Sequence, residues 1–264
     1  MTRLNRLLVS ALAGFMMAGT PSILLGRHFT ASAQQATDAS SKMEAGIKKA
    51  LGNSRFKNVQ SSVSDGIATL TGSVKVFDDK DQAEKKVKRV KGVVAVRNEI
   101  EVPRGEMNDQ QLQQKLVKSI EYDRVGYGTT AFNAISVSVQ NGVVTLGGTA
   151  WGPVDADSAA AVAANTPGVQ DVVNNIAVDP VSPMDDRIRI ATFRSIYGFG
   201  MLNKYAIDPG KPIRISVQNG NVTLYGVVDS QADKDAAGIR ANQVPGVFHV
   251  TNNLQVAGSS NKPK

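Results

Sequence analysis

Short stretches in which apolar and polar residues alternate occur in adjacent pairs at three places along this chain of 264 residues. Each pair is joined by two residues that favour a tight turn: Asp65-Gly66, Asn141-Gly142 and Asn219-Gly220. Alternation with a period of two predicts strands with one buried face, and Asn-Gly or Asp-Gly between them is typical of a hairpin turn. In the third hairpin, this register places Val217 opposite Val222 on an apolar face and Ser216 opposite Thr223 on a polar face.

Helical patterns lie on both sides of each hairpin. In the first copy, apolar residues three or four positions apart run from Met43 to Leu51 before the hairpin and from Ala83 to Val90 after it. A last alternating segment follows the second helix, so the order of elements is α-β-β-α-β. The predicted fold class is α+β, with three tandem small domains that each pack two helices on one face of a three-stranded mixed sheet.

Glycine and asparagine recur at constant spacing. In each copy three glycines are separated by 6 and 20 residues, and an asparagine follows six residues later. These residues are Gly66, Gly72, Gly92 and Asn98; Gly142, Gly148, Gly168 and Asn174; and Gly220, Gly226, Gly246 and Asn252. Corresponding hairpins lie 76 and 78 residues apart, which is typical of tandem structural units. We expect domains at 40–103, 109–179 and 186–257, with a short N-terminal segment at 34–39 and a flexible tail at 258–264.

Two of these repeated positions have a structural interpretation. Gly72, Gly148 and Gly226 lie opposite apolar residues of the paired strand, and we expect the missing side chain to let a helix pack closely. The three asparagines lie on an otherwise apolar strand face, where a ligand site is one interpretation. We favour hydrogen bonds from the asparagine side chains to backbone groups, which would fix the end of the strand.

The first 33 residues differ from the rest of the chain. Arg3 and Arg6 precede an apolar run, and Ala31-Ser32-Ala33 provides the small residues that a signal peptidase requires. We therefore expect a signal peptide at 1–33, cleaved after Ala33, and a periplasmic location. The alternative is a retained membrane anchor, which Pro21 disfavours because it interrupts a helix.

Charge is distributed unevenly along the chain, whose formal net charge is +7. Residues 40–103 contain 13 basic and 8 acidic side chains, residues 109–179 contain 3 and 7, and residues 187–257 contain 8 and 4. An anionic partner would therefore be attracted to the first and third domains.

The order of elements and two repeated motifs resemble the BON domain, named for bacterial osmotic-shock and nodulation proteins. The motifs are the hairpin Asn/Asp-Gly-x-Val/Ala-Thr-Leu-x-Gly and the strand Gly-Val-x-x-Val-x-Asn, and each occurs three times within residues 40–258. The resemblance implies a non-enzymatic domain of the bacterial envelope that is linked to osmotic or envelope stress. It also implies binding to phospholipid surfaces or assistance to outer-membrane proteins.

The residues themselves offer little catalytic chemistry. His249 is the only histidine after the predicted signal peptide, there is no cysteine, and neither a phosphate-binding loop nor a nucleophile turn is present. Asp78, Asp79 and Asp81 form an acidic group, but we interpret them as favourable charges at a helix start rather than a cation site. We expect no enzyme activity, cofactor, metal, small-molecule substrate or nucleic-acid partner.

A basic helix face is the first candidate for binding. In the second helix of the first copy, Ala83, Val87 and Val90 turn inward and five cations remain for solvent. They are Lys85, Lys86, Lys88, Arg89 and Lys91. This face suits an anionic membrane surface, and the alternative is an ordinary solvated helix face.

An aromatic connection in the third copy is the second candidate. Tyr197, Phe199 and Tyr205 suit an interface, with a weaker counterpart at Tyr122, Tyr127 and Phe132. The alternative is packing over the sheet of the same domain or its neighbour. The leading hypothesis is a protein that binds anionic phospholipid and supports envelope integrity under stress. The other is a periplasmic chaperone or scaffold for envelope proteins.

Overall fold

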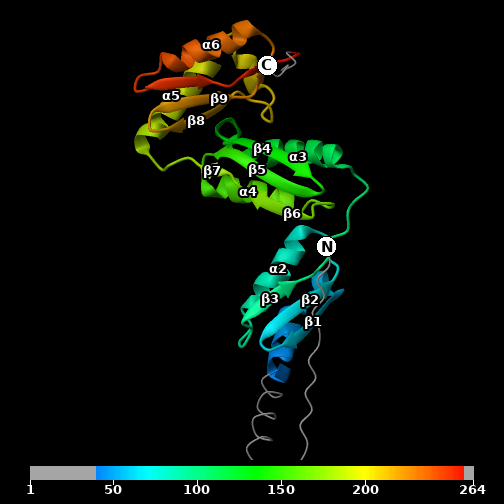
Figure 1. Cartoon of the computed structure of the whole chain (residues 1–264). Helices are drawn as coiled ribbons and strands as arrows, with labels where there is room; N and C mark the ends of the chain where they lie inside the picture. Colours follow the sequence, from blue (N-terminus) through cyan, green and yellow to red (C-terminus); the bar gives the residue numbers. More distant parts are fainter. Residues whose placement is uncertain (1–39, 259–264) are drawn as a thin grey trace, which may run out of the picture.

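The computed structural model describes residues 40–258, which form three units that follow one another along the chain (Figure 1). Figure 1 shows the first unit in blue and cyan, the second in green and the third in yellow to red. The predicted signal peptide at 1–33, the segment at 34–39 and most of the predicted tail lie outside the described residues. Within 40–258, no helix is both long enough and apolar enough to span a bilayer.

Each unit is built around an antiparallel hairpin with a left-handed turn. The angle φ is 52° at Asp65, 53° at Asn141 and 51° at Asn219, and the glycine that follows each also has positive φ. Aspartate and asparagine tolerate this conformation better than most residues. A turn with positive φ at both central residues matches the right-handed twist of the strands that it joins. The predicted pairing of Val217 with Val222 is confirmed.

A third strand lies parallel to the second strand of each hairpin, because a helix connects the two. The first unit comprises a helix at 40–50, η1 (Ser54–Phe56), β1 (Val59–Ser64), β2 (Ile67–Gly72), α2 (Phe77–Lys88) and β3 (Ala95–Asn98). The second comprises α3 (Asp109–Asp123), η2 (Val125–Tyr127), η3 (Thr130–Phe132), β4 (Ala134–Gln140), β5 (Val143–Ala150), α4 (Pro153–Ala164), β6 (Asp171–Asn174) and β7 (Ala177–Val178). The third comprises α5 (Pro183–Tyr197), η4 (Asn203–Ala206), β8 (Arg214–Gln218), β9 (Asn221–Tyr225), β10 (Val227–Val228), α6 (Gln231–Asn242), β11 (His249–Asn252) and β12 (Gln255–Val256).

The three sheets have the same order, with the central position taken by the second strand of the hairpin. The orders are β1-β2-β3, β4-β5-β6 and β8-β9-β11. Short additions distinguish the later units, since β7 also pairs with β5 and β10 pairs with β12. The predicted α+β fold of tandem small domains is confirmed.

Both helices of a unit contribute to one buried cluster on its sheet. In the second unit, Leu116 of α3 and Ala163 of α4 share a cluster with Leu146 of β5. Two aromatic side chains extend across unit boundaries. Phe77, the first residue of α2, packs against the cluster of the second unit, and Phe132 packs against that of the third.

The repeated asparagines make the predicted backbone contacts. The Nδ2 of Asn98 donates to the Lys80 carbonyl oxygen at 3.0 Å, and that of Asn252 donates to the Lys234 carbonyl oxygen at 2.7 Å. In all three units the asparagine Oδ1 also accepts from the amide two residues later. These bonds join the end of the third strand to the preceding helix in the first and third units.

The second glycine of each copy has a role that differs from the expected helix clearance. Gly72, Gly148 and Gly226 have φ of 100°, 84° and 127°. A Cβ at Gly148 would lie 2.0 Å from the Ala134 carbonyl oxygen of the paired strand, and the nearest atoms at Gly72 are likewise backbone. The helix-clearance interpretation is wrong, because backbone conformation and the neighbouring strand exclude a side chain here.

We expect Gly148→Ala to lower the free energy of unfolding by about 2 kcal/mol or more, since it adds both positive-φ strain and a clash with backbone. Urea denaturation checks this. Gly126→Ala is the matched control, because no atom lies within 4 Å of a Cβ at Gly126 and its φ is not positive. Equal stability of the two variants would contradict the assigned role.

A buried ion pair joins the second unit to the third. Asp179 directly follows β7 and is 2% exposed, and Arg189 of α5 is 1% exposed. Their Oδ2 and Nη2 atoms lie 3.0 Å apart. Asp179 also accepts hydrogen bonds from Ser216 and Gln218 of β8, each at 3.0 Å. The connection between these units is therefore fixed by the polar face of the third sheet.

We expect Asp179→Ala to lower the free energy of unfolding of the third unit by about 3 kcal/mol, because the buried Arg189 guanidinium keeps only the half-exposed Asp186 as a carboxylate partner. Asp179→Asn should cost less, since the amide oxygen still accepts from Ser216 and Gln218. Chemical denaturation followed by circular dichroism measures both. The prediction fails if Asp179→Ala costs no more than Asp171→Ala, which removes an exposed carboxylate.

Candidate functional site

Helix α2 has one buried face and one strongly basic face. Ala83 and Val87 are fully buried in the first unit. Asp78 and Asp79 lie in the first turn and lysines lie in the last turn. Negative charge at the start of a helix and positive charge at its end both interact favourably with the helix dipole. The helix is therefore stable with its cationic side chains directed away from the core.

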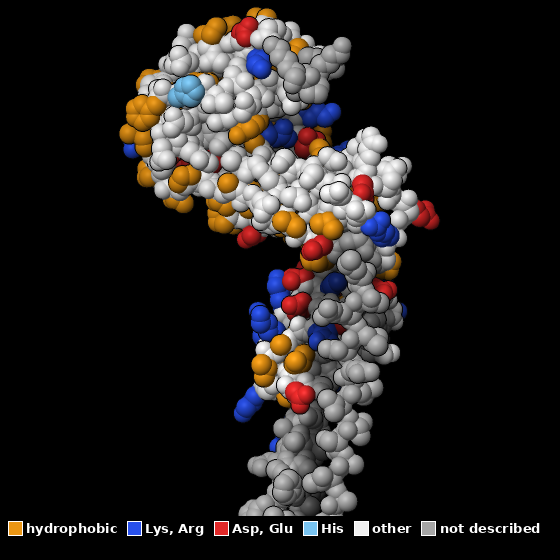
Figure 2. Space-filling model, viewed as in Figure 1, with side chains coloured by type: hydrophobic (Ala, Val, Ile, Leu, Met, Phe, Trp, Pro, Cys, Tyr) orange, Lys and Arg blue, Asp and Glu red, His pale blue; other side chains and the backbone are white. Residues whose placement is uncertain are grey.

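All five predicted cations of this face are exposed. Figure 2 shows Lys and Arg side chains gathered along the first unit. Lys85 forms an ion pair with Asp81 at 2.6 Å, and this hydrogen bond raises the pKa of the Lys85 ammonium. Within the described part of the chain, Lys86, Lys88, Arg89 and Lys91 form no ion pair. Helix α2 ends at Lys88, earlier than predicted, so Arg89 is its C-cap and Lys91 lies in the turn that follows. We call the five cations Lys85, Lys86, Lys88, Arg89 and Lys91 together the basic face of α2.

The acidic second unit does not cover the basic face of α2. Contact between the units is made by Phe77 at the start of α2, whose ring packs against the second unit's cluster. The cations begin two turns further along the helix and remain exposed. The basic face is therefore available to another molecule.

A buried aspartate occupies the third position of the second helix in every unit. Asp79, Asp155 and Asp233 are 8%, 5% and 3% exposed. Each pairs with a cation from the connection before its hairpin: Arg55 at 3.2 Å, Arg124 at 3.2 Å and Lys204 at 3.0 Å. Hydrogen bonds from Thr129 and Asn133 also reach Asp155. These three ion pairs, the connection clamps, attach each connection to the helix that follows the hairpin.

The sequence contained a signal for the connection clamps that our prediction missed. Each aspartate lies seven residues after the second repeated glycine, at Gly72, Gly148 and Gly226. For the first unit, the sequence predicts Asp78, Asp79 and Asp81 only as favourable charges at the helix start, without a specific partner. Asp78 and Asp79 both contact Arg55, at 3.4 and 3.2 Å.

The aromatic candidates of the third unit occupy different environments. Tyr197 packs against the core of the unit and donates to the Ile213 carbonyl oxygen at 2.8 Å. Tyr205 is 9% exposed, and its hydroxyl donates to Asp233 at 2.8 Å. Phe199 is 36% exposed, with the Arg240 guanidinium 5.4 Å from its ring centroid. Of the three, Phe199 presents its ring to solvent most.

The aromatic residues of the weaker counterpart in the second unit, Tyr122, Tyr127 and Phe132, also occupy different environments. Phe132 lies 5.8 Å from both Trp151 and Phe193, measured between ring centroids, and so belongs to the junction with the third unit. Tyr122 donates to Asp208 of the third unit at 2.7 Å. Tyr127 is 70% exposed beneath the Arg124 guanidinium, which lies 3.9 Å from its ring centroid.

Metal-binding chemistry finds no support among residues 40–258, because no group of three or more histidine or acidic side chains has a suitable arrangement. His249 begins β11 and is exposed. The fold thus defines a class of protein made of tandem α-β-β-α-β modules, and the basic face of α2 is an exposed, strongly cationic surface of the first unit.

Comparison with protein families identifies the modules. The BON domain matches residues 38–104, 108–180 and 201–258, and the chain therefore belongs to the BON domain family. The third match starts after α5. The third unit of the structure nevertheless includes α5, because this helix supplies Ile188 and Ile196 to its core.

Comparisons with individual proteins add little. No curated protein shows significant similarity to the chain. A solved structure of CdsD, a structural protein of the type III secretion system of Chlamydia trachomatis, is 16% identical, with a TM-score of 0.24 and coverage of 80% of this chain and 90% of that one. A structure of the CdsD C-terminal domain is 15% identical, with a TM-score of 0.23 and coverage of 80% and 96%. TM-scores this low support no conclusion about function.

The clamp of the third unit predicts a pH dependence. Burial alone would raise the pKa of Asp233, but hydrogen bonds with Tyr205, Lys204 and Ser230 outweigh burial and lower it. Because the pKa is lower in the folded state, this carboxylate stabilises the fold above the unfolded-state pKa of about 3.9. That stabilisation is lost as the pH falls through the folded-state pKa.

We expect Asp233→Asn to be less stable than the parent protein near neutral pH and to lose less stability on acidification. Urea denaturation over a series of pH values measures this difference. Asp235→Asn, which changes an exposed carboxylate on the same helix, should keep the parent pH profile. A parallel shift of the Asp233→Asn curve at every pH would contradict the clamp.

Proposed function

We propose that this BON protein is exported and acts without catalysis at the bacterial envelope, where it binds anionic phospholipid surfaces through the basic face of α2. The observation that carries the proposal is the exposure of all five cations of this face, while the acidic second unit leaves them uncovered. Membership of the BON family supports an envelope-associated role. We also propose a function in envelope integrity under osmotic or other stress, in line with membership of this family.

Electrostatics gives the expected strength of this interaction. Near an anionic membrane, each Lys or Arg contributes about 1 kcal/mol, and the attraction decreases with salt. A single cation would therefore bind weakly, whereas several on α2 and directly after its end act together. The third unit, which is also basic in sequence, provides a second region of attraction.

Sedimentation with vesicles tests the proposal, using the chain without residues 1–33 so that the predicted signal peptide does not insert. We expect recovery on anionic vesicles, little recovery on neutral vesicles, and weaker binding at about 200 mM than at about 50 mM salt. Lys86→Gln with Lys88→Gln should weaken binding by about thirtyfold, which corresponds to about 2 kcal/mol.

The matched control replaces Lys115 and Lys118 with glutamine. Both are exposed on α3 of the acidic second unit, so the change in net charge is the same. Equal losses in the two double variants would show that net charge, not the basic face of α2, governs binding. Equal recovery on neutral and anionic vesicles, or none on either, would refute the proposal.

The second candidate function is that of a periplasmic chaperone or scaffold for outer-membrane or other envelope proteins. Its support is the exposed apolar surface after α5, where Phe199 is 36% and Met201 is 47% exposed. Suppression of outer-membrane protein aggregation, lost in Phe199→Ser with Met201→Ser, would favour it. Tyr197 and Tyr205 are unsuitable for this test because both support the core of the third unit.

A further inference from the structure

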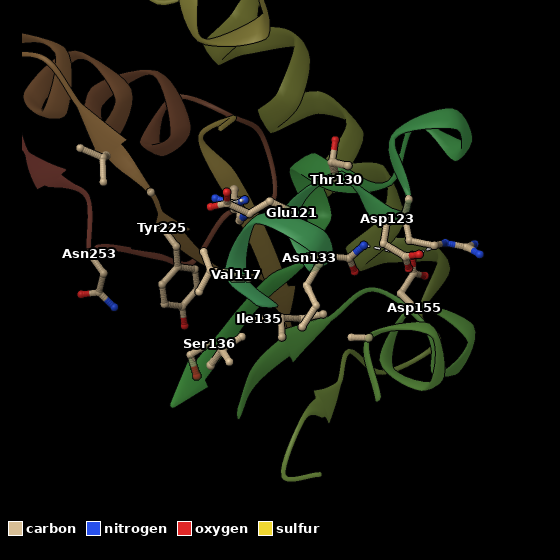
Figure 3. Close-up of a pocket in the computed structure, with 18 of the residues that line it drawn as sticks. Val117, Glu121, Asp123, Thr130, Asn133, Ile135, Ser136, Asp155, Tyr225 and Asn253 are labelled. Atoms are coloured by element: carbon tan, nitrogen blue, oxygen red, sulfur yellow. Dashed lines mark hydrogen bonds and ion pairs between the residues drawn. The ribbon is translucent and has the colours of Figure 1, made fainter. Parts of the chain in front are cut away.

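A cavity of about 340 Å³ lies at the junction of the second and third units. Its walls come from α3, β4 and the start of α4 on one side, and from the third unit on the other. Figure 3 shows Tyr225 and Asn253 entering from the third unit, with Glu121, Val117 and Ile135 on the second. Its volume is within the range of small-molecule sites, and it is large enough for more than water.

The cavity exists because the second unit lacks aromatic side chains that the third unit has. Asp109 and Asp185 each accept hydrogen bonds from the amides of their hairpin turn, which aligns α3 with α5. By this alignment, Val117 and Glu121 correspond to Phe193 and Tyr197. In the third unit, those two rings lie 4.6 Å apart, measured between centroids, and pack against the core.

Glu121 lies beside Arg214 of β8, but the two are loosely paired. The distance from Glu121 Oε1 to Arg214 Nη2 is 3.7 Å, and Arg214 directs this nitrogen to the Gly210 carbonyl oxygen at 2.7 Å. Burial raises the pKa of Glu121 and lowers the pKa of Arg214, despite the attraction between them. Each charge has therefore lost water without full compensation, and each would gain from an additional partner.

The other charged side chains of the cavity wall already have close partners, an ion pair for Arg124 and Asp155 and a hydroxyl for Asp123. Arg124 Nε contacts Asp155 at 3.2 Å, as part of the connection clamp of the second unit. Asp123 accepts a hydrogen bond from Ser158. Apolar surface is supplied by Val117, Ile120 and Ile135. The cavity thus combines one loosely paired carboxylate, one loosely paired guanidinium and an apolar wall.

We propose that this cavity binds a small zwitterion of the amino-acid class, with its carboxylate at Arg214, its ammonium group at Glu121 and its apolar part against Val117 and Ile135. A molecule with both charges gives each member of the loose pair a counter-charge and adds no net charge to the cavity. Because Glu121 and Arg214 belong to different units, the bound molecule also stabilises their junction.

Titrations of the ¹⁵N-labelled protein with three related molecules test this assignment. Leucine has both charges, 3-methylbutylamine is leucine without the carboxylate, and 4-methylpentanoate is leucine without the amine. We expect leucine to shift amide signals saturably on both sides of the cavity, at Ser136 and Val227. The amine and the carboxylate should each bind about tenfold or more weakly than leucine.

Two variants locate the binding. Glu121→Gln should weaken leucine binding by about tenfold or more. Val117→Phe should abolish binding, because the added ring would fill the cavity in the way that Phe193 fills the corresponding space of the third unit. The controls are Glu106→Gln, at an exposed residue, and Val94→Phe, which repeats the Phe248 of the third unit at an exposed position. Both controls should bind leucine like the parent protein.

Several outcomes would overturn the proposal. Absence of saturable shifts with leucine would refute the proposed binding of an amino acid, and equal binding of the amine or the carboxylate would exclude a zwitterion. Binding to phosphatidylethanolamine vesicles but not to free leucine would assign the site to a lipid headgroup instead. None of these results affects the vesicle test of the basic face of α2, which lies in another unit.

Discussion

A buried carboxylate at the start of the second helix organises each unit of this protein. The helix provides unpaired backbone amides that favour a negative charge, and the connection before the hairpin provides a cation that neutralises it. Arg55, Arg124 and Lys204 fill this role in three connections that differ in length and sequence. A long connection can therefore vary between copies while the sheet and the helix that follows it keep their geometry.

Contacts between units depend mostly on residues that are not shared by the copies; Phe132 is the exception, since its counterpart Phe56 is buried in the core of the first unit. Phe77 joins the first unit to the second, whereas Phe132 and the Asp179–Arg189 pair join the second to the third. The same difference between copies creates the junction cavity, because Val117 and Glu121 replace the ring pair formed by Phe193 and Tyr197. Repetition supplies the framework, and substitutions within the repeat supply its distinct surfaces.

The two proposed sites use charge in different ways. On the basic face of α2, several exposed cations act additively on a large anionic surface, and salt weakens their effect. In the cavity, one cation and one anion are partly deprived of water, so a small molecule with complementary charges gains more from each contact. A surface interaction and a pocket interaction can therefore coexist, since they lie in different units and respond to different partners.

The sequence by itself determined the repeated fold. Asn-Gly and Asp-Gly turns, strand alternation and constant glycine spacing are local features, and they gave the correct register and order of elements. It also identified the cations of α2, since a helix with Ala83 and Val87 inside leaves Lys86 and Lys88 outside. Only the tertiary structure showed why position 148 requires glycine, that Tyr197 and Tyr205 pack in the core, and that Glu121 pairs with Arg214. Those properties depend on distances between residues far apart in the chain, which the spacing of residues along a sequence does not specify.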